Sequence, residues 1–111
     1  MGRVLHMNDT FELKNLVTRK DDIKKIKAGK KSAVRRSNRF GEVGDTWELD
    51  GELFVLVNVY QQKLGNVTEE NAKQEGYPNL DEYINGITSI HEGSVWDPEY
   101  KVWVHEFKAK N

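Results

Sequence analysis

The chain has 111 residues, a formal net charge of −1, 37% hydrophobic residues, three Trp, four Tyr and four Phe side chains, and no cysteine. The length suits a single domain over residues 1–111, the aromatic content excludes a disordered chain, and the missing cysteines exclude disulfides, thiolate zinc ligands and a cysteine nucleophile. Because no apolar run is long enough to cross a membrane and the start has no signal-peptide pattern, we expect a cytoplasmic protein without membrane contact.

The first third of the chain predicts a strand, a helix and an extended basic segment. A short strand is expected at the start of residues 10–16. Residues 21–29 read as a helix, with Asp21 as its N-cap and Gly29 as the stop after its last turn. Small and β-branched residues then alternate with basic ones over residues 30–36, which predicts an extended segment.

A hairpin is the clearest local signal. Two apolar runs, residues 46–49 and 52–60, flank the pair Asp50-Gly51, which is typical of a type I′ turn. The second run is apolar at nearly every position. It therefore predicts a central strand that is buried on both faces.

The last half of the chain predicts two short helices and a final strand. Thr68 caps a helix that runs to Gln74, and Gly76 ends it. Residues 80–87 form a second helix with Tyr83 on its apolar face, and residues 100–108 form the last strand. Together these elements predict an α+β fold: a small mixed β-barrel with two or three short peripheral helices.

Charge is divided along the chain. Residues 14–39 carry eleven basic and two acidic side chains, whereas residues 40–111 carry five basic and fourteen acidic ones. The basic segment is either a solvated face that packs against the acidic part of the chain or a site for phosphate, nucleotide or nucleic acid. Arg35, Arg36 and Arg39 favour the second interpretation, because planar guanidinium groups suit phosphate.

The basic segment also carries a family pattern. Gly29, Lys31 and Arg36 fall on three of the four fixed positions of Gly-x-Lys-x-x-Glu-x-Arg, the signature of ASCH domains. These domains are a branch of the PUA-like β-barrels. A hairpin, a helix ending near Gly76 and an aromatic last strand follow in the family's order, so residues 21–108 resemble an ASCH domain.

This resemblance implies a barrel with a cleft between the basic strand and the helix that ends at Glu75. Family members are assigned to RNA or nucleotide binding, and a small bacterial subset hydrolyses N4-acylated cytidine. The catalytic group of that subset corresponds here to Lys31, Val34 and Glu75. Val34 has neither the carboxylate of the signature nor the hydroxyl of the subset, and Ser32, two residues away on the same face, is the nearest hydroxyl.

Acyl hydrolysis needs a nucleophile or an activated water, a base, and an acid for the leaving amine. Lys31 and Glu75 are the candidate catalytic pair, with Ser32 as a weaker third member; the alternative is an ordinary Lys31–Glu75 ion pair. The histidines, His6, His91 and His105, lack metal-ligand spacing. We therefore expect no metal and no cofactor.

Aromatic residues divide into core and surface candidates. Strand patterns place Trp47, Phe54, Trp103 and Phe107 in the core, whereas Trp96 lies in a loop where it either stacks a base or plugs the barrel. The leading hypothesis is a module that binds RNA or a modified nucleotide; the alternatives are a nucleoside amidohydrolase and a domain that docks an acidic protein. The residues expected to contact nucleic acid are Lys30, Lys31, Arg35, Arg36, Arg39 and Trp96.

Overall fold

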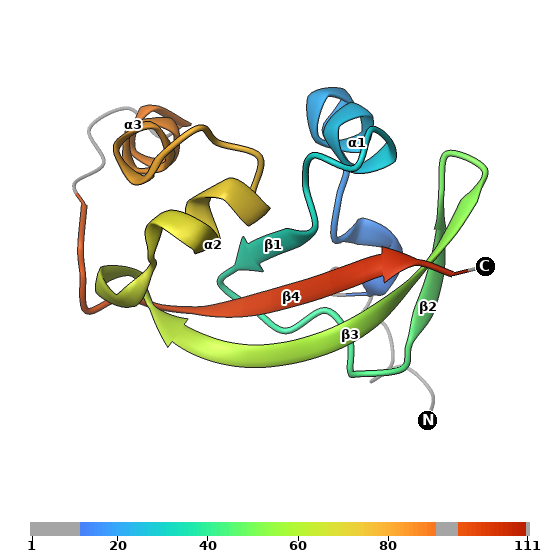
Figure 1. The fold of residues 1–111 in the computed structure, drawn as a ribbon. Helices are drawn as coiled ribbons and strands as arrows, with labels where there is room; N and C mark the ends of the chain where they lie inside the picture. Colours follow the sequence, from blue (N-terminus) through green and yellow to red (C-terminus); the bar gives the residue numbers. More distant parts are fainter. Residues whose placement is uncertain (1–11, 91–95, 111) are drawn as a thin grey trace.

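A four-stranded antiparallel sheet in the order β1-β4-β3-β2 forms the centre of the fold (Figure 1). The structure, a computed structural model, describes residues 12–90 and 96–110. The α+β class predicted from the sequence is confirmed, and the four described strands are antiparallel throughout. The strands are β1 (Ala33–Arg36), β2 (Thr46–Leu49), β3 (Glu52–Lys63) and β4 (Lys101–Ala109).

Three helices and two 3-10 turns accompany the sheet in the described ranges. Figure 1 shows α2 and α3 together near the end of β3, whereas α1 lies toward the β2–β3 hairpin. Lys27 holds α1 there, because its ammonium donates to the carbonyl of Asp50 at 3.0 Å and to the Asp50 carboxylate at 3.1 Å. The elements are α1 (Lys20–Lys27), α2 (Glu69–Gln74), α3 (Leu80–Ile90), η2 (Leu13–Asn15) and η3 (Leu64–Asn66).

The helix boundaries follow local signals, with two corrections. The predicted stop at Gly29 is confirmed by its φ of +78°, and the Thr68 cap of α2 is confirmed by the hydrogen bond from the Asn71 backbone N–H. The N-cap of α1 is Arg19 instead of Asp21, which lies within the first turn. The start of residues 10–16, where a short strand is expected, lies outside the described residues, and the described remainder contains the turn η2. Helix α3 continues three residues beyond the prediction.

The hairpin has the predicted turn, but its second strand is not buried on both faces. Asp50 and Gly51 have φ angles of 52° and 85°, as a type I′ turn requires. β3 is central in the sheet, as expected. However, Leu53 and Val57 are each 43% exposed. They alternate with inward-facing Phe54, so the sheet is packed on one face only at this end.

Two apolar clusters cover opposite faces of the sheet. Adjacent strand residues point to opposite faces, so Val34 lies in one cluster while Arg35 faces the other. We call the larger cluster the main core; it contains Leu16, Val17, Ile26, Val34, Trp47, Leu49, Phe54, Leu56 and Phe107. We call the other the small core; it contains Leu64, Val67, Ala72, Tyr83 and Val102.

The predicted core aromatics are mostly confirmed. Trp47, Phe54 and Phe107 contact one another in the main core with ring centroids 5.5–6.0 Å apart. Trp103 is only partly buried, and the Arg39 guanidinium lies 5.4 Å from its ring centroid. Across the described residues, no helix is both long and apolar enough to span a membrane.

Candidate functional site

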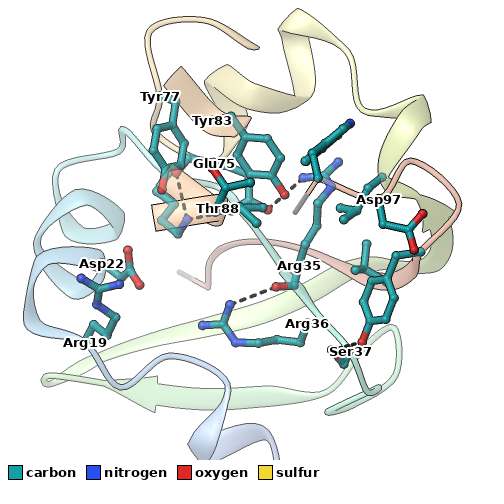
Figure 2. Close-up of a pocket in the computed structure, with 16 residues that line it drawn as sticks. Arg19, Asp22, Arg35, Arg36, Ser37, Glu75, Tyr77, Tyr83, Thr88 and Asp97 are labelled. Atoms are coloured by element: carbon teal, nitrogen blue, oxygen red, sulfur yellow. Dashed lines mark hydrogen bonds and ion pairs between the residues drawn. The ribbon is translucent and has the colours of Figure 1, made fainter. Parts of the chain in front are cut away.

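A cavity of about 600 Å³ lies beside β1, between the start of α1 and the α2–α3 region (Figure 2). It combines four cationic side chains with three carboxylates and four aromatic rings. The charged lining residues are Arg19, Asp22, Lys31, Arg35, Arg36, Glu75 and Asp97. The aromatic ones are Tyr77, Tyr83, Trp96 and Tyr100. A cavity of this size with a mixed polar and aromatic lining is typical of small-molecule binding sites.

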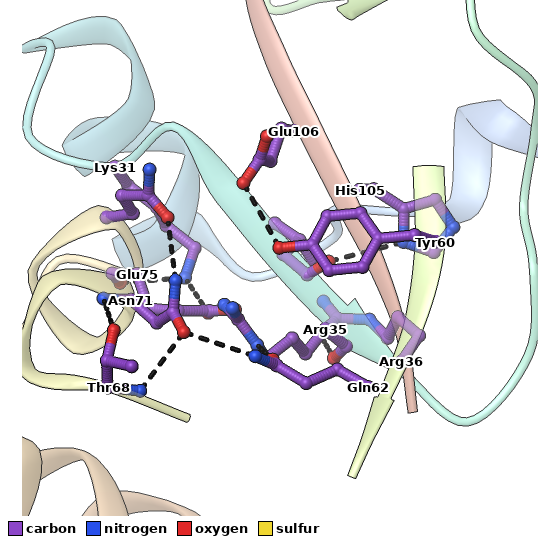
Figure 3. Close-up of polar contacts among 12 residues, drawn as sticks. Lys31, Arg35, Arg36, Tyr60, Gln62, Thr68, Asn71, Glu75, His105 and Glu106 are labelled. Carbon is purple, nitrogen blue, oxygen red and sulfur yellow. Dashed lines mark hydrogen bonds and ion pairs between the residues drawn. The ribbon is translucent and has the colours of Figure 1, made fainter. Parts of the chain in front are cut away.

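A buried ion triad forms what we call the pocket floor, defined by Lys31, Arg35 and Glu75 (Figure 3). Lys31 Nζ lies 2.9 Å from Glu75 Oε1, and Arg35 Nη1 lies 2.9 Å from Glu75 Oε2. Lys31 Nζ also donates to the Glu75 backbone carbonyl at 2.8 Å. The three side chains are only 6%, 2% and 6% exposed in the order Lys31, Arg35, Glu75, and two cations share one carboxylate. Counted formally, these two cations and one carboxylate give the floor one net positive charge.

The end of α2 positions Glu75 over β1. Gly76 has a φ of +93°, which ends the helix directly after Glu75. The Ser32 backbone N–H then donates to the Gln74 carbonyl at 2.8 Å, so the helix end and the start of β1 are joined. Lys31 and Arg35 are four residues apart in an extended segment and therefore reach the same face.

Gln62 of β3 supports the triad, and Asn71 of α2 supports Gln62 in turn. Arg35 Nε donates to Gln62 Oε1 at 2.9 Å, and Gln62 Nε2 donates to Asn71 Oδ1 at 3.2 Å (Figure 3). Asn71 also accepts from the Thr68 backbone N–H at 3.0 Å, which completes the capping box of α2. One chain of hydrogen bonds therefore links β1, β3 and the start of α2.

Aromatic and hydroxyl groups form the remaining walls. Tyr77 and Tyr83 pack edge to face with centroids 5.4 Å apart, and Lys25 Nζ lies 5.1 Å from the Tyr77 centroid. Burial raises the pKa of Tyr77 and of Tyr83, and the nearby Glu75 carboxylate raises both further. Both phenols therefore keep their protons at neutral pH. Ser37 and Tyr100 join their hydroxyls at 2.7 Å on the other side.

Five of the residues singled out from the sequence meet at this pocket: Lys31, Arg35, Arg36, Glu75 and Trp96. Arg36 donates to the Leu16 carbonyl at 2.9 Å and to the Arg35 carbonyl at 3.0 Å. Trp96 is half-buried and also packs against the small core, so its ring is both wall and packing residue.

The other sequence candidates lie elsewhere. Lys30, Ser32 and Arg39 are exposed and are not among the residues that line the cavity. Val34, at the signature position, is 0% exposed and lies in the main core, on the opposite face of β1 from Arg35. No side chain at that position can therefore reach the pocket without a change in the strand.

Of the three histidines, His105 lies within the described residues. His105 is 0% exposed; its Nε2 accepts from the Phe40 backbone N–H at 3.0 Å, and its Nδ1 lies 3.2 Å from the Val34 carbonyl. Both ring nitrogens are used inside the protein. His6 and His91 lie outside the described residues. Within the described ranges, no group of three His, Cys, Asp or Glu side chains could hold a metal.

Sequence reasoning missed three residues that shape this site: Gln62, Asn71 and Tyr83. Gln62 ends an apolar strand run, and Asn71 stands three residues after a cap threonine, where a polar side chain signals a capping box. The sequence predicts Tyr83 on the apolar face of its helix, and its ring does lie in the small core. Its hydroxyl was the available signal, because a buried phenol usually needs a polar partner.

Comparison with known proteins identifies the fold through solved structures. No model of a known protein family and no curated protein matches the sequence. A solved ASCH domain from Lactobacillus crispatus JV V101 has a TM-score of 0.60 and 17% identity, covering 80% of this chain and 70% of that one. A protein of the family DUF984 from Enterococcus faecalis V583 has a TM-score of 0.63 and 17% identity, covering 79% of this chain and 66% of that one. The chain therefore has the ASCH-like fold that its sequence predicts.

Proposed function

We propose that this chain binds RNA or a nucleotide in the pocket beside β1. The observation that carries the proposal is the buried floor, where Lys31 and Arg35 share the single carboxylate of Glu75 at 2.9 Å. An uncompensated buried cation is costly, and an anionic ligand offsets that cost. The aromatic walls supply ring faces for a base, which typically contribute about 1–3 kcal/mol per stacked base.

A salt titration of binding tests this proposal. Affinity for a labelled single-stranded RNA is measured by fluorescence anisotropy at several salt concentrations. We expect log Kd to change linearly with log salt, by about 0.7 per phosphate contact. No binding at low salt, or binding that salt does not change, would contradict the proposal.

Two matched arginine variants locate the site. Arg19 lines the cavity, whereas Arg39 is exposed and does not. We expect Arg19→Gln to weaken binding and to lower the salt slope by about 0.7, while Arg39→Gln has a smaller effect. If binding were lost in Arg39→Gln alone, the ligand would bind at the outer surface near Trp103 instead of in the cavity.

A second candidate, hydrolysis of an N4-acylated cytidine, is favoured by the direct Lys31–Glu75 contact at 2.9 Å in the same cavity. In this reaction, water adds to the amide carbonyl, the C–N bond breaks, and the products are a carboxylic acid and cytidine. Because Val34 faces the main core, the nucleophile in this chain is a water held near Lys31 and Glu75. Incubation with N4-acetylcytidine and chromatography of the products tests it. Activity that survives both Lys31→Ala and Glu75→Ala rules out this site.

A further inference from the structure

Three buried polar side-chain atoms make no hydrogen bond within the described residues: Arg35 Nη2, Tyr83 Oη and Trp47 Nε1. Trp47 lies in the main core, away from the cavity. The other two belong to residues that line the same cavity. Buried polar groups without partners are rare in folded proteins, so two in one pocket point to a partner supplied from outside.

Arg35 presents its free nitrogen in a fixed direction. Its Nε is held by Gln62 Oε1 and its Nη1 by Glu75 Oε2, both at 2.9 Å. The guanidinium group is planar, so these two contacts also set the position of Nη2. The side chain is 2% exposed, and Nη2 cannot turn toward bulk water.

Tyr83 supplies the second free group from α3. The residue is 2% exposed, and Figure 2 shows its hydroxyl directed toward the Glu75–Arg35 contact. Burial raises the pKa of this phenol, so it remains protonated and can donate a hydrogen bond. The two unused groups therefore lie in the same part of the cavity and both act as donors.

The floor offers donors and positive charge but few acceptors. Glu75 Oε1 is bound by Lys31, and Glu75 Oε2 is bound by Arg35. A ligand group that fits these surroundings must bring acceptor oxygens and negative charge. A phosphate monoester has both, with a charge of about −1.5 to −2 and three acceptor oxygens. A nucleobase carbonyl brings acceptors without the charge.

We propose that the pocket floor binds the terminal phosphate monoester of a nucleotide, with Arg35 Nη2 and the Tyr83 hydroxyl donating to its oxygens. This inference rests on the proposed function. The phosphate is terminal because both donors are buried, the Arg35 side chain and Tyr83 each being 2% exposed, so only the end of a ligand can reach them, whereas an internal phosphodiester continues as chain on both sides. The ligand is thus a free nucleotide or the phosphorylated end of an RNA strand.

Binding of matched probes by isothermal titration calorimetry tests this inference. The probes are a nucleoside, its monophosphate, inorganic phosphate, and a short RNA with and without its terminal phosphate. We expect the monophosphate to bind roughly 10- to 100-fold more tightly than the nucleoside, as two charge-assisted hydrogen bonds imply. If the source is RNA, removing the terminal phosphate causes the same loss although the internal phosphodiesters remain.

Two tyrosine variants separate recognition from folding. Tyr83→Phe removes the free hydroxyl, so we expect it to reduce the preference for the monophosphate about tenfold while leaving the unfolding midpoint unchanged or raised. Tyr60→Phe is the control, because its hydroxyl donates to Glu106 at 3.4 Å and the residue does not line the cavity. We expect Tyr60→Phe to bind the monophosphate like the unaltered protein.

The outcomes distinguish this inference from the proposed function. Equal affinity for nucleoside and monophosphate, or an unchanged preference in Tyr83→Phe, overturns the phosphate assignment but leaves nucleotide binding intact. Inorganic phosphate binding as tightly as the monophosphate overturns the nucleotide part of the assignment. No binding of any nucleoside, nucleotide or RNA overturns the proposed function itself, and the inference with it.

Discussion

The two faces of the sheet are built from different chemistry. The main core is a continuous apolar cluster in which Phe107 packs edge to face against Trp47 and Phe54. The buried imidazole of His105 has a hydrogen-bond partner at each ring nitrogen. The opposite face has a smaller apolar cluster and buries the Lys31–Glu75–Arg35 triad instead.

This difference assigns different roles to the two faces. Apolar burial stabilises a fold directly, whereas a buried ion pair often stabilises no more than apolar residues of the same volume. The triad is therefore weak evidence for a stabilising role, and its place beside the cavity of about 600 Å³ is the basis of the proposed ligand site. One strand serves both faces, because Val34 enters the main core and Arg35 enters the pocket floor.

Breaking the triad gives the largest expected effect. Glu75→Ala leaves two buried cations unpaired and should lower the free energy of unfolding by about 3–5 kcal/mol. The matched control is Glu99→Ala, because Glu99 pairs with Lys63 at 2.9 Å on the surface, where such pairs are worth about 0–1 kcal/mol. Urea denaturation measures both. Similar losses in the two variants would show that the triad is not electrostatically isolated from water.

Converting the pocket floor into apolar core sharpens the comparison. In a triple variant, Lys31→Met, Arg35→Met and Glu75→Leu replace the charges with apolar groups of similar volume. We expect it to recover most of the stability lost in Glu75→Ala, because the desolvation cost disappears, and to lose nucleotide binding. Stability is measured by urea denaturation and binding by calorimetry. Binding that persists in this variant would place the ligand outside the pocket.

The main core gives the next effect. Val34→Thr buries a hydroxyl among apolar side chains and should lower the free energy of unfolding by roughly 1–3 kcal/mol. Val57→Thr is the control, because Val57 is 43% exposed on β3 and the change should be nearly neutral. The Val34→Thr protein should gain no N4-acetylcytidine hydrolysis, since this side chain faces away from Glu75. Increased hydrolysis would show that β1 can turn the side chain of residue 34 toward the pocket.

Local signals made much of the fold predictable. The Asp50-Gly51 turn, the glycine stops and the Thr68 cap depend on backbone geometry that only a few residue types favour, so neighbouring letters in the sequence are sufficient. The Lys31–Glu75 contact was predictable only from the family resemblance, because the two residues are 44 positions apart and no local rule joins them.

The rest depended on tertiary contacts. The apolar run of β3 looks buried on both faces, but whether a second layer covers Leu53 and Val57 is decided by elements far along the chain. Likewise, Gln62 and Tyr83 enter the site through the packing of β3 and α3 beside β1. The face that Val34 occupies also follows from strand register, which the signature alone does not define.

The cap of α2 gives a smaller effect on the pocket side. Thr68 Oγ1 accepts from the Asn71 backbone N–H at 3.1 Å, and Thr68→Ala should lower the free energy of unfolding by about 1 kcal/mol. Thr46→Ala, at the exposed start of β2, is the matched control and should change it less. Because Asn71 also binds Gln62, the Thr68 variant should weaken nucleotide binding as well. Unchanged binding would show that the helix cap does not influence ligand binding at the pocket floor.

His105 gives the smallest effect at neutral pH, because its consequence appears only in acid. Burial lowers the pKa of His105 below its ordinary value of 6.5, and the charge of Arg36 lowers it further, although the hydrogen bond to the Val34 carbonyl opposes this. The unfolded chain therefore takes up a proton on this ring at a higher pH than the folded chain does. It follows that the free energy of unfolding is fully maintained above about pH 6.5 and falls as the pH drops toward the folded-state pKa. Protonation also removes the acceptor that Nε2 offers to the Phe40 N–H at 3.0 Å.

Urea denaturation of the unaltered protein and of His105→Gln across this pH interval isolates the effect of the imidazole, because the carboxylates titrate in both proteins. We expect the two proteins to converge in stability as the pH falls; a constant difference would mean that the ring takes up its proton equally well in the main core and in water.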